Sequence, residues 1–292
     1  MNRTSENRRI KIQNHTMTRE EIVEQIKSKR SFLCVGLDTD IRKIPQHLLR
    51  GDNPMFDFNK EIIDATASSC IAYKLNVAFY ETLGAFGFSV LEQTINYIRE
   101  HYPEIFIIAD AKRGDIGNTS LMYARSFFEH FKVDAITVAP YMGKDSVSPF
   151  LSYKDKWVIL LALTSNEGAK DFQMLRDEEG KYLFERVIET SQTWENSDRL
   201  MLVVGATQSD MLQQVRKAAP EAFLLVPGIG AQGGDFGALV QYAMTDDCGL
   251  IVNSSRAIIY ADSSERFATV AKYEAEQLRR QMEEALVSRG II

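Results

Sequence analysis

The sequence predicts an α/β protein folded as a (β/α)8 barrel of the TIM type, because eight short apolar runs alternate with amphipathic helical segments. The runs are apolar throughout, which is typical of parallel strands covered by helices on both faces. The length of 292 residues fits one barrel with insertions. We therefore expect a single TIM-barrel domain over residues 17–292.

The eight expected strands are rich in branched and aromatic residues. They are Phe32–Leu37, Ile71–Ala78, Ile105–Ala109, Ala135–Ala139, Val158–Leu163, Leu200–Val204, Phe223–Val226 and Leu250–Val252. Between them, apolar residues such as Met211, Leu212 and Val215 recur at helical spacing. A doubly wound open sheet is the alternative, but no GxGxxG motif follows the first strand, which weakens a dinucleotide-binding interpretation.

Two segments fall outside the regular alternation. Residues 1–16 are polar and lack the apolar core of a signal peptide, so we expect a disordered leader. The widest gap lies between the fifth and sixth strands, where Phe184, Val187 and Ile188 have helical spacing after the polar turn Arg176–Lys181. We interpret residues 166–198 as an insertion together with the fifth barrel helix, and not as a second domain.

The composition excludes several classes of function. A net charge of −6 argues against a general nucleic-acid binder, although a few local cations can still bind a small anion. No apolar run approaches the length of a membrane span. The cysteines Cys34, Cys70 and Cys248 are widely spaced and form no CxxC pair, which indicates reduced core thiols in a cytoplasmic protein.

Polar residues occupy corresponding positions on six of the expected strands, at the ends where a barrel builds its active site. Each has a simpler structural explanation as a cap, a turn residue or a solvated charge. Their shared position on six strands favours a functional site. They are Asp38, Lys74, Asn76, Asp110, Lys112, Asp115, Thr164, Ser165, Asn166, the turn Pro227–Gly234, and Asn253 to Arg256.

The charged end of the third strand is the most informative of these. Asp110 and Lys112 are two residues apart and face the same side of a strand, whereas Asp115 falls in the loop or first helical turn. On the second strand, Lys74 lies among apolar residues, where an ammonium is unfavourable unless it is paired. A surface salt-bridge cluster is the structural alternative, but this face of a barrel must hold the ligand.

The glycine-rich turn after the seventh strand and the arginine after the eighth indicate a phosphate site. Gly228 and Gly230 allow backbone N–H groups to approach an anion closely. Arg256 can hold two phosphate oxygens in fork geometry, and Gln232 can donate a further hydrogen bond. Barrels commonly bind phosphate at these two loops.

With these residues assembled, the chain resembles the orotidine 5′-phosphate decarboxylase family from about Phe32 to Tyr260. The pattern Asp110-x-Lys112-x-x-Asp115 is shared with sibling sugar-phosphate decarboxylases and synthases. The length and the segment after the fifth strand resemble the longer bacterial subgroup. The specific signature combines the charged pattern with Asp38, Lys74, the Thr164-Ser165 pair, the turn PGIGAQGGD and Arg256.

The resemblance implies cofactor-free and metal-free decarboxylation of orotidine 5′-monophosphate to UMP, the last step of pyrimidine nucleotide synthesis. It implies that Lys112 protonates a C6 carbanion, that Asp110 faces the substrate carboxylate, and that Lys74 holds Asp110. It also implies a homodimer with shared sites, in which Asp115, Ile116 and Thr119 reach across to the neighbouring subunit. The remaining implied contacts are Asp38 to the ribose, Ser165 to the pyrimidine amide, and Pro227, Gly228, Gly230, Gln232 and Arg256 to the phosphate.

Three other functions stay open at this point. A keto-sugar-phosphate decarboxylase of the same superfamily would use the aspartates with Mg²⁺, but Lys74 stands where such a site would want a carboxylate. A class I aldolase would form a Schiff base on Lys112, which flanking aspartates disfavour by keeping the lysine protonated. A non-catalytic phosphate-binding barrel is the third, and the intact Asp-Lys-Asp set argues against it.

Overall fold

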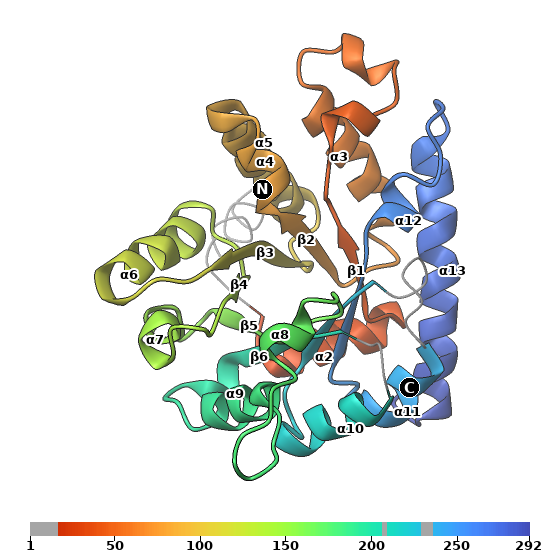
Figure 1. Ribbon diagram of the computed structural model, residues 1–292. Helices are drawn as coiled ribbons and strands as arrows, with labels where there is room; N and C mark the ends of the chain where they lie inside the picture. Colours follow the sequence, from red (N-terminus) through yellow and green to blue (C-terminus); the bar gives the residue numbers. More distant parts are fainter. Residues whose placement is uncertain (1–16, 206–208, 229–235) are drawn as a thin grey trace, which may run out of the picture.

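Eight parallel strands close into a barrel in the computed structural model, in the order β1-β2-β3-β4-β5-β6-β7-β8 (Figure 1). The structure describes residues 17–205, 209–228 and 236–292. The predicted (β/α)8 fold class is therefore confirmed. The strands are β1 (Leu33–Gly36), β2 (Ala72–Asn76), β3 (Phe106–Arg113), β4 (Ala135–Val138), β5 (Trp157–Leu163), β6 (Leu200–Val204), β7 (Leu224–Pro227) and β8 (Leu250–Ser254).

Helices follow the strands and surround the barrel (Figure 1). In the described part of the chain, none of them is long and apolar enough to cross a bilayer. The longer helices are α2 (Arg19–Lys29), α3 (Pro54–Thr66), α5 (Gly84–His101), α6 (Gly117–Arg125), α7 (Lys144–Leu151), α9 (Leu183–Gln192), α10 (Ser209–Ala218), α11 (Phe236–Ala243) and α13 (Phe267–Ser288). The short ones are α4 (Val77–Glu81), α8 (Ala169–Phe172), α12 (Arg256–Ile259), η1 (Ile41–Lys43), η2 (Leu48–Arg50), η3 (Ser126–His130) and η4 (Ser197–Arg199).

Each predicted strand overlaps an observed one, but two boundaries differ in ways that affect the site. The second strand, predicted to run to Ala78, ends at Asn76, and α4 begins at once with Val77. The third strand, predicted to end at Ala109, continues to Arg113 and so includes the charged residues. Its pairing with β4 shifts register between Ala109 and Arg113, which is the mark of a bulge.

The parallel register brings the ends of β1, β2 and β3 together. Gly36 pairs with Lys74 across β1 and β2, and Asn76 pairs with Asp110 across β2 and β3. Strands of this barrel are buried along most of their length, and β1, β4, β6 and β8 are buried throughout. Polar side chains therefore become accessible where the strands end, at the face that carries their C-terminal loops.

Candidate active site

A row of alternating charges crosses the C-terminal ends of β1, β2 and β3. The Lys74 Nζ lies 3.1 Å from an Asp110 carboxylate oxygen and 3.5 Å from Asp38 Oδ1. The Lys112 Nζ lies 2.5 Å from the other carboxylate oxygen of Asp110. The structure thus brings together four of the predicted site residues, Asp38, Lys74, Asp110 and Lys112, and we call these four residues the charged row.

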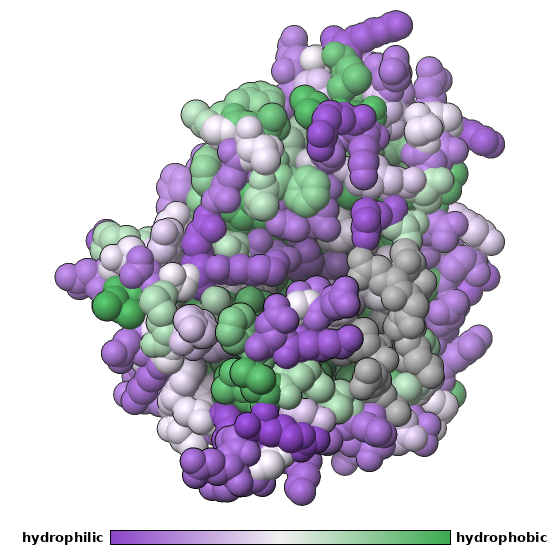
Figure 2. Space-filling model, in the orientation of Figure 1, coloured by the Kyte–Doolittle hydropathy of each residue, from purple (hydrophilic) through white to green (hydrophobic). Residues whose placement is uncertain are grey.

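The face that Figure 1 turns toward the viewer is hollowed near its centre, and hydrophilic surface gathers there (Figure 2).

Burial changes along the charged row. The Lys74 side chain is 6% exposed and that of Asp110 is 11% exposed, whereas the Lys112 side chain is 51% exposed. One ammonium is therefore enclosed by protein, and the other is open to an incoming ligand.

The two lysines of the charged row keep the Asp110 carboxylate ionised. Burial alone raises the pKa of Asp110, but the ammonium groups of Lys74 and Lys112 outweigh it and lower the pKa to about 2. For Lys74, burial acts in the opposite direction and lowers the pKa. The carboxylates of Asp38 and Asp110 outweigh burial and raise the pKa of Lys74 above its usual value. Asp110 therefore carries a full negative charge at neutral pH.

Thr137 on β4 fixes both members of the Asp110–Lys112 pair. Lys112 has a positive φ of 48°, an uncommon backbone conformation for a residue with a side chain. Its N–H donates to Thr137 Oγ1 at 2.9 Å, and that hydroxyl donates to Asp110 Oδ1 at 2.9 Å. One buried hydroxyl thus supports the bulged backbone and orients the carboxylate.

Sequence reasoning missed Thr137, because the residue lies inside a run that is otherwise apolar. A second missed residue is Tyr260, which follows α12. The Tyr260 hydroxyl donates to the carbonyl oxygen of Asp38 at 3.0 Å and accepts the Asp40 N–H at 2.6 Å. It fixes the backbone that carries Asp38. The only sequence signal for Thr137 was that it is a lone threonine in an apolar strand, and Tyr260 had no such signal.

Asp115 does not join the charged row within one chain. None of the ion pairs among the described residues connects it to Lys112, and Asp115 Oδ1 instead accepts the Ile116 N–H at 2.7 Å. The side chains of Ile116 and Thr119 are exposed beside it at the start of α6. Ile116 and Thr119 are therefore accessible at the surface next to Asp115.

The ends of β7 and β8 are paired, which places the predicted phosphate residues near each other. Pro227 pairs with Asn253, and the Gly228 N–H donates to the Asn253 carbonyl oxygen at 3.0 Å. Gly228 has a φ of 73°, which favours glycine. The exposed Arg256 opens α12 directly after β8. The predicted phosphate residues Gly230 and Gln232 lie outside the described residues.

Gly36, at the end of β1, was not singled out from the sequence. A Cβ on Gly36 would lie 1.8 Å from the Ser255 hydroxyl oxygen. A side chain at position 36 would therefore overlap the side chain of Ser255, which lies directly before Arg256. This close approach seats the start of α12 at the mouth of the barrel.

The family of this chain follows from its similarity to known proteins. A family model described as "Orotidine 5′-phosphate decarboxylase / HUMPS family" matches residues 31–270. A Porphyromonas gingivalis protein named orotidine 5′-phosphate decarboxylase is 63% identical over 276 residues, which cover 94% of this chain and 100% of that protein. The chain belongs to the orotidine 5′-phosphate decarboxylase family.

Solved structures place the chain in the same family. A Leishmania donovani OMP decarboxylase is 36% identical with a TM-score of 0.74, over 89% of this chain and 98% of that chain. A Leishmania donovani UMP synthase is 38% identical with a TM-score of 0.77, over 90% of this chain but 57% of that longer chain. The family resemblance indicated by the sequence motifs is therefore confirmed.

In this member of the orotidine 5′-phosphate decarboxylase family, an ammonium stands between the carboxylates of Asp38 and Asp110. Among the described residues, no group of three or more His, Cys, Asp or Glu side chains is arranged to hold a metal. The Lys112 ammonium can stabilise negative charge on a ligand beside it, and the Asp110 carboxylate can stabilise positive charge.

Replacing Thr137 with valine should lower the free energy of unfolding by about 2–3 kcal/mol, because two buried hydrogen bonds are lost and one of them reaches a charged group. Thr137→Ser keeps the hydroxyl and loses only a methyl group, so about 1 kcal/mol is expected. Urea unfolding of both variants measures the difference. Equal decreases in the free energy of unfolding of the two variants would show that the hydroxyl contributes nothing to stability.

The depressed pKa of Asp110 makes stability depend on pH in a defined direction. The usual pKa is 3.8 and the folded value is about 2, so the stabilisation is present above about pH 4 and is lost as the pH falls toward 2. Between about pH 5 and about pH 3, the free energy of unfolding of the wild type should fall by about 1 kcal/mol more than that of Asp110→Asn. Unfolding curves for both proteins that fall in parallel over this range would contradict the assignment.

Proposed function

We propose that the charged row decarboxylates orotidine 5′-monophosphate to UMP, the last step of de novo pyrimidine nucleotide synthesis. The observation that carries this assignment is the half-exposed Lys112 ammonium, held 2.5 Å from a carboxylate that remains ionised at neutral pH. Family membership supplies the reaction, and the charged row supplies residues suited to it.

The reaction requires electrostatic stabilisation of a carbanion. When the bond between C6 and the carboxylate carbon breaks, CO2 leaves and the electron pair stays on C6. That pair lies in the plane of the ring and is not delocalised into it. The Lys112 ammonium stabilises the developing negative charge and then donates its proton to C6, after which the neutral amine takes a proton from water.

Asp110 and Lys74 prepare this step. Asp110 faces the substrate carboxylate, and at ~4 Å two like charges repel by about 4 kcal/mol at an effective dielectric constant near 20. The repulsion is relieved as CO2 departs. Lys74, enclosed between Asp38 and Asp110, holds the inner carboxylate in place while it carries this charge.

The other substrate contacts follow the strand ends. Asp38 binds the ribose, and Ser165 binds the pyrimidine amide. The phosphate is held by Pro227, Gly228, Gly230, Gln232 and Arg256. In support, Arg256 is exposed and opens α12 directly after β8. Binding energy at the distant phosphate can orient the reacting end of the substrate.

Two subunits complete each site in this proposal. Asp115, which has no ion pair with Lys112 of its own chain among the described residues, serves the charged row of the neighbouring subunit, with Ile116 and Thr119 beside it. Exposed apolar side chains in the same region support a second copy of the chain as the partner, and they are Ile116, Met122, Tyr141 and Met142. The three buried free cysteines support a cytoplasmic location.

Lys112→Ala should reduce turnover by at least about 10³-fold, because both the charge opposite the carbanion and the proton donor are lost. Its affinity for UMP should change by less than about fivefold, since the phosphate and ribose contacts remain. Lys112→Arg is the matched variant: it keeps the charge but holds its proton too tightly to donate it. The absorbance change of orotidine 5′-monophosphate measures turnover, and near-normal rates in Lys112→Ala would refute the role.

Mixing Lys112→Ala with Asp115→Ala should restore activity, because one of the two sites in a mixed dimer is intact. At random pairing of equal amounts, about a quarter of the wild-type specific activity is expected. Subunit exchange is verified with two affinity tags. No recovery despite proven exchange would show that each site is built within one chain.

Activity in excess EDTA separates this mechanism from the Mg²⁺-dependent alternative. We expect turnover to be unchanged, because Lys74 provides the positive charge between the two carboxylates. Loss of activity that added Mg²⁺ restores would favour the metal-dependent reaction.

A further inference from the structure

We propose that Gln173, in the segment that follows β5, is a positioning residue for the pyrimidine end of the substrate. Its side-chain amide fixes Thr164, the residue next to Ser165. The inference rests on the proposed role of Ser165 as the partner of the pyrimidine amide. It gives the segment between β5 and α9 a function in base recognition.

Both polar atoms of the Gln173 amide are used on Thr164. The Thr164 N–H donates to Gln173 Oε1 at 2.7 Å, and Gln173 Nε2 donates to Thr164 Oγ1 at 2.9 Å. That hydroxyl in turn donates to Asn166 Oδ1 at 2.6 Å. The paired register of β5 ends at Leu163, so the amide takes over where the sheet stops supporting the chain.

Gln173 can act as a fixed support because its own backbone is anchored. Its N–H donates to the Ala169 carbonyl oxygen at 2.9 Å, and its carbonyl oxygen accepts the Phe184 N–H at 3.1 Å. The side chains of Ala169 and Phe184 are both buried. The amide is therefore presented from backbone that is tied to the barrel through α8 and α9.

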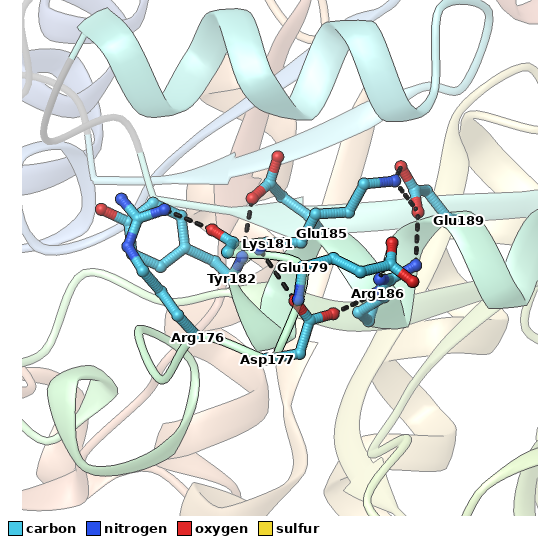
Figure 3. A network of polar contacts seen from close by, with 9 residues as sticks. Arg176, Asp177, Glu179, Lys181, Tyr182, Glu185, Arg186 and Glu189 are labelled. Atoms are coloured by element: carbon cyan, nitrogen blue, oxygen red, sulfur yellow. Dashed lines mark hydrogen bonds and ion pairs between the residues drawn. The ribbon is translucent and has the colours of Figure 1, made fainter.

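The turn beyond Gln173 is also tied to α9, as Figure 3 shows. Arg186 pairs with Asp177, and Lys181 Nζ lies 2.7 Å from Glu189 Oε1. The Arg176 guanidinium lies 3.8 Å from the centre of the Tyr182 ring, and the same two residues form a β-bridge. An exposed ion pair contributes little alone, but these contacts join both sides of the turn to one helix.

Gly205, which follows β6, approaches Ser165 closely. A Cβ on Gly205 would lie 2.8 Å from both the backbone nitrogen and the Cβ of Ser165. The Gly205 N–H donates to the Leu163 carbonyl oxygen at 2.8 Å, which holds this close approach. Ser165 itself is exposed, so it remains accessible to a ligand although Gly205 lies against it.

This arrangement acts on one end of the substrate only. Gln173 and Gly205 support the end of β5, whereas the proposed phosphate residues follow β7 and β8. A ligand with a pyrimidine ring should therefore respond to changes at Gln173, and a ligand without one should not. UMP and ribose 5-phosphate form this pair of probes.

Gln173→Ala should weaken UMP binding about tenfold through loss of two hydrogen bonds that order the base-binding segment. Ribose 5-phosphate binding should stay within about twofold. In turnover, KM for orotidine 5′-monophosphate should rise more than kcat falls. Gln173→Glu is the matched variant, because it keeps the acceptor for the Thr164 N–H but cannot donate to Thr164 Oγ1. We expect its loss of UMP affinity to be smaller than that of Gln173→Ala. Titration calorimetry with both probes and thermal melts of each variant provide the measurements.

Ser165→Ala and the double variant separate this inference from the proposed function. If Gln173 acts through Ser165, the losses in UMP affinity are non-additive. Unchanged UMP affinity in Gln173→Ala, equal weakening of both probes, or additive losses would overturn the inference while the role of Ser165 stands. Unchanged UMP affinity in Ser165→Ala would overturn that role, and with it the route by which Gln173 acts.

Discussion

The enclosed ammonium of Lys74 is the constraint on which the rest of the site depends. Removing a charge from water is unfavourable by several kcal/mol unless partners compensate, and here two carboxylates do so. Lys74 and its two partners lie on or directly after three neighbouring strands, so the arrangement requires the closed barrel and its register. The same pairing keeps Asp110 ionised, and an ionised Asp110 in turn holds the outer ammonium of Lys112.

The outer end of the charged row is set by a local irregularity in the sheet. The bulge in β3 gives Lys112 a positive φ and directs its N–H to Thr137. Unfavourable backbone conformations persist when surrounding contacts determine them, and they concentrate at functional sites. The hydroxyl of Thr137 provides two such contacts. Gln173 has the corresponding part at the end of β5, where its side-chain amide holds both the backbone N–H and the hydroxyl of Thr164.

The fold was largely predictable because its signal is local. Continuous apolar runs separated by helical spacing identify buried parallel strands, and all eight were found. Boundaries were less certain where one apolar pattern runs into another. The stretch after Asn76 stays apolar while the backbone changes from strand to helix, and periodicity cannot locate that change over so few residues. In β3 the opposite occurred, since charged residues concealed the last part of a strand.

The sequence by itself predicted the chemical groups of the site. The members of the charged row, Gly228 and Arg256 stand at or near the ends of predicted strands, and motif spacing along the chain is enough to single them out. Only the tertiary structure decided how these groups are held. Thr137, Tyr260, Gln173, Gly36 and Gly205 act through contacts with residues distant in the sequence or across a bulge. Such contacts depend on which strands are neighbours and in what register, and no local pattern of residues records that information.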